Sequence, residues 1–159
     1  MFSGRRLNGR GKRVSGDNDM DLKVKQAIQD AVANEPFAIA MKIRLTKLDD
    51  GVSVVEMIYD PEKQSNIYAR AHGGAIYGLI DEAFETAGQT EGTIAVALNV
   101  NVTYIASPND GDHLRAEAKR ISQTKKTASY EIRVTNQSGT LIATCQALAY
   151  RTGKVIPFL

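Results

Sequence analysis

The stretch from residue 66 to 87 constrains the fold more than any other part of the chain. From residue 75 onward its apolar residues recur at the spacing of one face of an α-helix. These apolar residues are Ala75, Ile76, Leu79, Ile80, Ala83, Phe84 and Ala87. A stripe of this width is sufficient for a sheet to wrap around it. We therefore predict a long central helix that begins at Gly73 and continues to about Gln89.

The start of this helix carries two glycines and no conventional capping residue. No Ser, Thr, Asp or Asn stands in the two or three positions before Gly73, so we expect the first backbone amides to lack a side-chain partner. These amides carry the positive end of the helix dipole, and Gly73 and Gly74 leave room for a ligand to approach them. Such a helix start suits a developing oxyanion.

The polar side of the same helix offers carboxylates. It is formed by Tyr77, Gly78, Asp81, Glu82 and Glu85. Asp81 follows His72 by nine residues, which corresponds to roughly 13 Å along a helix. The two side chains therefore cannot act on one small reacting group within a single chain. Either Asp81 is an ordinary surface acid, or a two-fold dimer places Asp81 of one copy against the helix start of the other.

The rest of the chain predicts an antiparallel sheet around that helix. Two strands precede the helix, at 37–48 and 52–59, and a loop at 60–71 carries Asn66. Four strands follow it, at 93–105, 113–122, 127–136 and 141–151, with turn-forming residues between them. A helix at about 19–33, which Pro36 ends, comes before the sheet. This order indicates an α+β layer architecture.

Composition indicates one globular domain. The chain has 159 residues, of which 43% are hydrophobic and 24% charged, values ordinary for a soluble protein with a sizeable core. No apolar run reaches the length of a membrane span, and the N-terminus lacks the apolar centre of a secretory signal. The single cysteine, Cys145, excludes an internal disulfide and fits a cytoplasmic protein. One cysteine and two histidines cannot assemble the usual zinc clusters, so we expect no metal site.

The first residues of the chain are basic. Residues 1–16 contain arginine and lysine but no acid, so the remainder of the chain carries a net negative charge. An arm for nucleic acid or membrane phosphates is one interpretation of this segment. Because no aromatic residue lies between its basic residues, we instead expect a flexible, solvated tail at 1–19 followed by a single domain at 20–159. We accordingly expect neither a nucleic-acid nor a membrane partner.

The residues around the central helix resemble those of a known family. The pattern Asn66-x5-His72-Gly73-Gly74-x6-Asp81, followed by Ala-Phe, resembles the hotdog-fold acyl-CoA thioesterases of the phenylacetate-pathway (PaaI-type) branch. The resemblance extends over roughly 36–154. It implies a hotdog fold, in which an antiparallel sheet wraps around one long helix, plus a short N-terminal helix. It also implies a homodimer or a dimer of dimers that hydrolyses small-molecule acyl-CoA thioesters without a cofactor, because CoA is part of the substrate.

The resemblance also suggests which residues form the site. Asp81 matches the family's catalytic carboxylate, and Asn66 matches the amide that orients the water or the carbonyl. His72, Gly73 and Gly74 match the oxyanion-binding helix start. Further candidate substrate-binding residues are Tyr77, Glu85, Ala97, Asn99, Lys125 and Lys126. The chain departs from the family pattern twice: the region 68–70 replaces a glycine often found there, and Ala97 stands where relatives carry Ser or Thr.

The chemistry itself leaves alternatives open. Thioester hydrolysis requires a water, a base and a group that stabilises the oxyanion. Asp81 could be the general base, or it could attack directly to give a mixed anhydride. Burial and the like charges of Glu82 and Glu85 would raise its pKa. His72 is as suited to anchoring the helix start as to contacting substrate. The alternative function is a hotdog that binds acyl-CoA or an acyl carrier without turnover, which the Ala97 departure keeps open.

The remaining predictions concern cations that could bind the phosphates of CoA and the positions of His113 and Cys145. CoA carries phosphates, and cations are available near the strand ends. They are Lys119, Arg120, Lys125, Lys126, Arg151 and Lys154. We expect His113 on the surface and Cys145 in the core, within a row of small residues that allows close packing.

Overall fold

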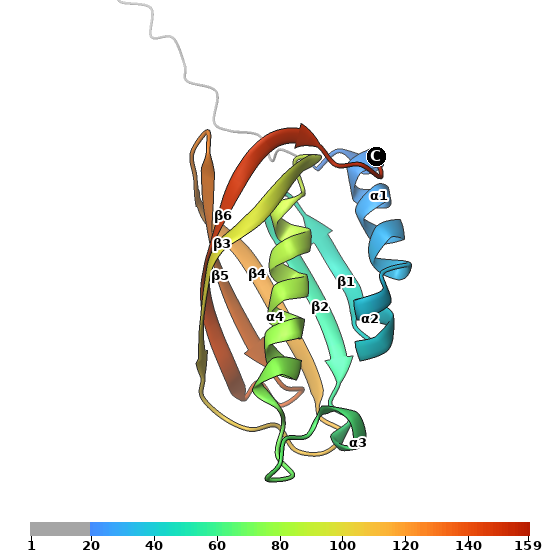
Figure 1. Cartoon of the computed structure of the whole chain (residues 1–159), viewed down its shortest axis with the longest axis vertical. Helices are drawn as coiled ribbons and strands as arrows, with labels where there is room; N and C mark the ends of the chain where they lie inside the picture. Colours follow the sequence, from blue (N-terminus) through green and yellow to red (C-terminus); the bar gives the residue numbers. More distant parts are fainter. Residues whose placement is uncertain (1–19) are drawn as a thin grey trace, which may run out of the picture.

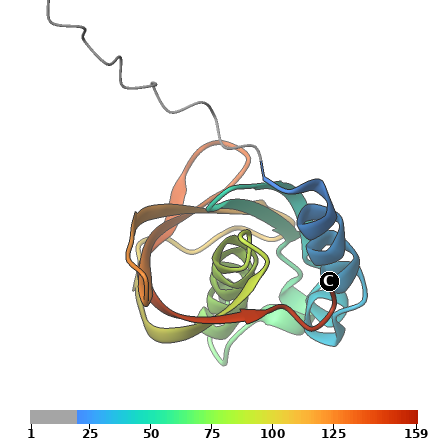
Figure 2. The same ribbon diagram turned by 90° about the horizontal axis from the view of Figure 1, so that it is seen from above.

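A six-stranded antiparallel sheet wraps around helix α4 (Gly73–Gly88) in the computed structural model, which describes residues 20–159 (Figure 1). The strands are β1 (Arg44–Asp49), β2 (Val52–Ile58), β3 (Thr93–Tyr104), β4 (His113–Gln123), β5 (Thr127–Thr135) and β6 (Leu141–Val155). Their order in the sheet is β1-β2-β4-β5-β6-β3, so β1 and β3 are its two edges. Seen from above, the sheet curls around α4 as predicted (Figure 2).

The core lies between α4 and the concave face of the sheet. Leu79 and Ile80 of α4 are completely buried, and the ring of Phe84 packs edge-on against that of Tyr130 on β5. The row of small residues on β6 is also buried, which allows this strand to pass close to the helix. Its members are Ala143, Cys145, Ala147 and Ala149. The prediction that Cys145 belongs to the core is therefore confirmed.

Three short helices accompany the sheet: α1 (Leu22–Ala33), α2 (Pro36–Met41) and α3 (Pro61–Gln64). The side chain of Asp21 caps α1 by accepting the N–H of Lys23 at 2.8 Å. One face of α1 is buried, and the helix lies beside β1 (Figure 1). No helix within residues 20–159 combines the length and the apolar character that crossing a membrane would require.

The predicted strand at 37–48 is wrong over its first half. Pro36 does not merely end α1; it occupies the first turn of α2, where its fixed φ suits a helix. Lys42 then adopts a left-handed φ of 56° that ends α2, and β1 begins only at Arg44. The predicted loop at 60–71 likewise contains a helical turn, α3, that opens on a proline.

The edge strand β3 does not keep a regular alternation of buried and exposed side chains. Its pairing with β6 is irregular between Thr93 and Ala95 and again between Ala97 and Asn99. As a result, the apolar side chains of β3 divide between the core and the surface. The basic tail predicted at 1–19 lies outside the described residues.

Candidate active site

The prediction that no side chain caps the central helix is wrong, because His72 is its N-cap. The Nδ1 atom of His72 accepts the N–H of Gly74 at 2.9 Å. The backbone carbonyl of His72 accepts the N–H groups of Ala75 and Ile76. Of the four N–H groups that open a helix, only that of Gly73 lacks a hydrogen-bond partner within residues 20–159. His72 thus anchors the helix start, and Gly73 retains a donor for a ligand.

Both glycines at the helix start allow side chains to approach the backbone. The hydroxyl of Tyr104, on β3, donates to the carbonyl of Gly73 at 3.0 Å. A Cβ atom at Gly73 would lie 3.2 Å from the Tyr104 ring, and one at Gly74 would lie 2.9 Å from His72 Nδ1. A larger residue at position 74 would therefore disturb the cap.

Asn66 is held within its own loop, between α3 and α4. Its Oδ1 accepts the N–H groups of Tyr68 at 2.9 Å and Arg70 at 3.2 Å. Within this turn Ala69 has a φ of 54°, a left-handed conformation that favours glycine. The region that departs from the family's glycine pattern therefore still adopts a glycine-like backbone. The Oδ1 atom is thus engaged, whereas the side-chain NH₂ of Asn66 makes no hydrogen bond within residues 20–159.

Asp81 lies two turns along α4, half-buried beside a cavity of about 160 Å³ between the helix and β3. The cavity is lined by Asp81, Phe84, Glu85, Gly88, Ala95, Val96, Ala97 and Ala149. Three predicted site residues therefore come together here: Asp81, Glu85 and Ala97. Burial raises the pKa of Asp81, which brings this carboxylate closer to the working range of a general base.

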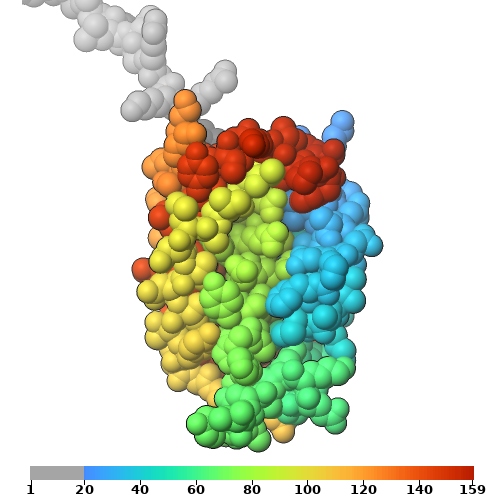
Figure 3. All heavy atoms as spheres, in the orientation of Figure 1, coloured from blue at the N-terminus to red at the C-terminus, as the bar shows by residue number. Residues whose placement is uncertain are grey.

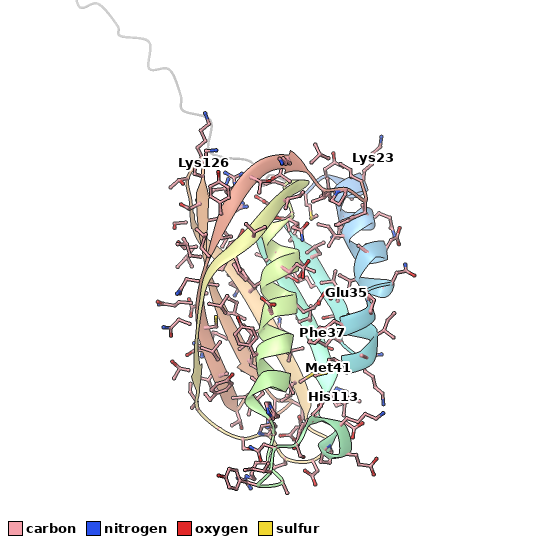
Figure 4. All side chains as sticks on the ribbon, in the orientation of Figure 1. Lys23, Glu35, Phe37, Met41, His113 and Lys126 are labelled. Atoms are coloured by element: carbon pink, nitrogen blue, oxygen red, sulfur yellow. The ribbon has the colours of Figure 1, made fainter. Side chains whose placement is uncertain are left out.

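Tyr77 lies one turn before Asp81 on the same side of α4. Burial, followed by the negative charge of Asp81, raises the pKa of the Tyr77 hydroxyl. At the next position, Gly78, a Cβ atom would lie 2.6 Å from the ring of Phe37, which comes from α2 (Figure 4). Glycine at this position therefore lets α2 approach the central helix.

Other predicted site residues are not brought to Asp81 within one chain. Gly73 and Asp81 are eight residues apart on the same helix, a separation of roughly 12 Å. Asn99 is exposed on β3 and does not line the cavity. Lys125 and Lys126 lie at the tip of the β4–β5 hairpin, where Lys126 Nζ is 5.5 Å from the centre of the Tyr150 ring (Figure 4).

Half of the cations considered for CoA phosphates are already paired with acids. Arg120 bonds Asp50 at 2.8 Å and Glu91 at 3.0 Å, Arg151 bonds Glu91, and Lys119 bonds Glu117. Lys125, Lys126 and Lys154 make no ion pair with a carboxylate in the described part of the chain. His113 is exposed, as predicted.

Comparisons with known proteins identify the family. Residues 68–143 match the family model of the thioesterase superfamily. A putative esterase of Archaeoglobus fulgidus is 33% identical over 124 residues, which cover 78% of this chain and 80% of that protein. The acyl-coenzyme A thioesterase PaaI of Escherichia coli is 30% identical over 137 residues, which cover 86% of this chain and 97% of that protein. The chain belongs to the thioesterase superfamily.

Solved structures agree with this assignment. The structure of the E. coli PaaI protein matches the thioesterase with a TM-score of 0.80 at 30% identity, covering 84% of this chain and 96% of that one. A Streptococcus mutans protein bound to acetyl CoA matches with a TM-score of 0.68 at 26% identity, and the match covers 72% of this chain and 91% of that one. The predictions of a hotdog fold, of a PaaI-type member and of a hydrolase are confirmed.

The thioesterase carries a second group of carboxylates, which residue spacing alone does not bring together. Oxygen atoms of Glu35, Glu82 and Glu85 all lie within 4.8 Å of one another. Burial, followed by the charges of Glu35 and Glu85, raises the pKa of Glu82 to about 8. The interval of three between Glu82 and Glu85 indicated that these two share a face. The contribution of Glu35, from the junction of α1 and α2, has no signal in the sequence.

Proposed function

We propose that this thioesterase hydrolyses acyl-CoA thioesters to the free acid and CoA. The observation that carries the proposal is Asp81, a half-buried carboxylate beside a cavity, on a helix whose first N–H is free to bind an oxyanion. The E. coli relative named as an acyl-coenzyme A thioesterase and the S. mutans structure with acetyl CoA support the substrate class. The reaction would need no cofactor, since CoA is itself part of the substrate.

In the proposed reaction, Asp81 accepts a proton from water as the water oxygen attacks the thioester carbonyl. The Gly73 N–H donates to the oxyanion of the tetrahedral intermediate, and the Asn66 NH₂ orients the carbonyl or the water. The intermediate then expels the CoA thiolate, which takes up the proton. In the alternative path, the Asp81 carboxylate attacks the carbonyl, CoA leaves, and water hydrolyses the resulting mixed anhydride.

We further propose that two subunits share each site, with Asp81 of one facing Gly73 of the other. Support comes from the roughly 12 Å that separate these residues along one helix and from the position of the cavity beside β3, an edge strand. The surface of β3 exposes Val96, Leu98 and Tyr104, and Figure 3 shows α4 reaching the surface next to it. Pairing β3 with a second copy would cover these apolar side chains and the open edge.

The activity is tested with a panel of acyl-CoA thioesters and a free-thiol assay, comparing wild type with Asp81→Asn. We expect the variant to lose about a hundred- to ten-thousandfold in rate, the usual contribution of a general base. Asp110→Asn, at an exposed turn, is the control and should be fully active. Equal thiol release by wild type and Asp81→Asn would remove Asp81 from the mechanism. Tight binding of acyl-CoA without release by wild type would favour a non-catalytic binding protein.

Mixed dimers test whether the site is shared. Asp81→Asn lacks the carboxylate, and Gly73→Pro lacks the N–H donor, so each variant alone should be nearly inactive. A dimer with one subunit of each type would contain one intact site if Asp81 and Gly73 come from different chains. Random reassociation of equal amounts should then restore about a quarter of wild-type activity. No recovery after verified subunit exchange would show that both residues must come from one chain.

A further inference from the structure

The three glutamates Glu35, Glu82 and Glu85 line a second cavity, to which the proposed thioester chemistry assigns no role, although Glu85 also lines the cavity beside Asp81. The second cavity measures about 350 Å³ and lies on the side of α4 that faces α1, away from β3. Glu82 is the most deeply buried of the three glutamates, since only 3% of this residue is exposed. Its Oε1 atom is fully buried and has no hydrogen-bond partner in the described structure. A buried, unpartnered carboxylate oxygen is costly unless a ligand or a proton satisfies it.

No basic side chain of residues 20–159 neutralises this pocket. None of the three carboxylates forms an ion pair within residues 20–159, and no lysine or arginine lines the cavity. Glu35 precedes α2 as its N-cap residue, yet its side chain makes no capping hydrogen bond and is free to face the pocket. Apart from a side-chain hydrogen bond between Glu35 and Glu82 themselves, the one polar side-chain contact of the three acids within residues 20–159 is Gln89 Nε2, which donates to Glu85 at 3.4 Å.

The spacing of the oxygen atoms suits a single ion. Calcium binds carboxylate oxygens at about 2.3–2.6 Å, so ligands on opposite sides of one ion lie up to about 5 Å apart. One oxygen from each glutamate falls within 4.8 Å of the other two. Magnesium, at about 2.0–2.1 Å, demands a tighter arrangement and keeps more of its waters. We propose that Glu35, Glu82 and Glu85 form a binding site for one divalent cation that prefers oxygen ligands, with calcium the best fit.

Such an ion would connect two parts of the fold. Glu35 belongs to the junction between α1 and α2, whereas Glu82 and Glu85 belong to the central helix α4. A bound cation would therefore hold α1 and α2 against α4, the helix that carries Asp81. Protons compete for the same oxygens. The charged groups that face Glu82 are Glu35, Glu85 and Asp81, all acidic, and together with burial they raise the pKa of Glu82 to about 8.

The test measures cation binding and thermal unfolding of the full chain, and neither readout depends on thioester hydrolysis. Protein stripped with EDTA and dialysed is titrated calorimetrically with calcium, magnesium or manganese chloride at about pH 8.5, above the pKa of Glu82. We expect one calcium per chain. The melting temperature should rise by about 5–10 °C when free calcium exceeds its Kd a hundredfold, and EDTA should reverse the rise.

Variants locate the ion. Glu82→Gln and Glu85→Gln should each lose the calcium response, whereas Glu131→Gln, an exposed acid on β5, should keep it. Because Glu85 is the more exposed of the two pocket residues, Glu85→Gln decides the matter if Glu82→Gln does not fold. The proposal is wrong if millimolar calcium, magnesium and manganese all leave wild type unchanged. It is equally wrong if Glu85→Gln binds the ion as wild type does.

Discussion

Replacing Gly73 by proline removes the one N–H at the start of α4 that has no hydrogen-bond partner within residues 20–159. The N–H of Gly74 donates to His72, and those of the next two residues donate to the His72 carbonyl. Proline at this position is compatible with the fold, because the first helical residue needs no donor. His72, with a ψ of 130°, already has the extended conformation required before proline.

The structure also indicates how large the loss of activity should be and which variant serves as the control. With a single free donor, its loss should lower kcat by about a hundred- to a thousandfold, or roughly 2.7–4 kcal/mol of transition-state stabilisation. Gly73→Ala introduces a Cβ at the same 3.2 Å from Tyr104 but keeps the N–H. We expect it to remain within about tenfold of wild type. Steady-state acyl-CoA hydrolysis by the free-thiol assay, with unfolding curves for both variants, separates loss of the donor from loss of structure.

Two results would refute this reasoning. If Gly73→Pro hydrolyses acyl-CoA within a few-fold of Gly73→Ala, the Gly73 N–H does not stabilise the oxyanion. If Gly73→Ala is as inactive as Gly73→Pro while both remain folded, the contact with Tyr104 rather than the N–H controls activity.

Three further predictions concern stability and reactivity. The folded-state pKa of Glu82, about 8 against an ordinary 4.5, means that the folded protein retains a proton that the unfolded chain releases between these values. With chelator present, the melting temperature should therefore fall as pH rises across that window, and Glu82→Gln should flatten the profile. Arg120→Ala should lower the free energy of unfolding by about 2–3 kcal/mol in urea titrations, because it leaves Asp50 and Glu91 without their shared partner. The Cys145 thiol, buried and with its pKa raised by burial to about 11, should react with thiol reagents only after unfolding; rapid reaction of native protein would contradict this.

Periodicity was sufficient to predict the central helix and most of the sheet. The stripe from Ala75 to Ala87 has a single interpretation because one face must be covered, and the structure buries all seven of its members. The strand over 127–136 was equally clear, since every second residue from Ala128 to Val134 enters the core. These elements are determined by which side chains must leave water, and that information is local.

The predictions failed where a neighbour far along the chain decides the conformation. The segment from Phe37 to Met41 alternates in a way that suits a strand, yet Pro36 and the contact of Phe37 with Gly78 make it a helix. Glu82 was placed on the polar side of the helix, but it is buried beside residues of α1. His72 lies outside the usual list of capping residues, although its Nδ1 makes the same hydrogen bond. None of these contacts can be deduced from spacing.

The polar face of α4 divides into two sides with different chemistry. Successive residues of a helix point about 100° apart, so Asp81 faces β3 while Glu82 faces α1, and each lines its own cavity. Glu85, one turn further along, lines both cavities. Burial, followed by the charges of Glu35 and Asp81, raises the pKa of Glu85. A cation held by Glu35, Glu82 and Glu85 would therefore share one ligand, Glu85, with the cavity beside the carboxylate proposed for catalysis.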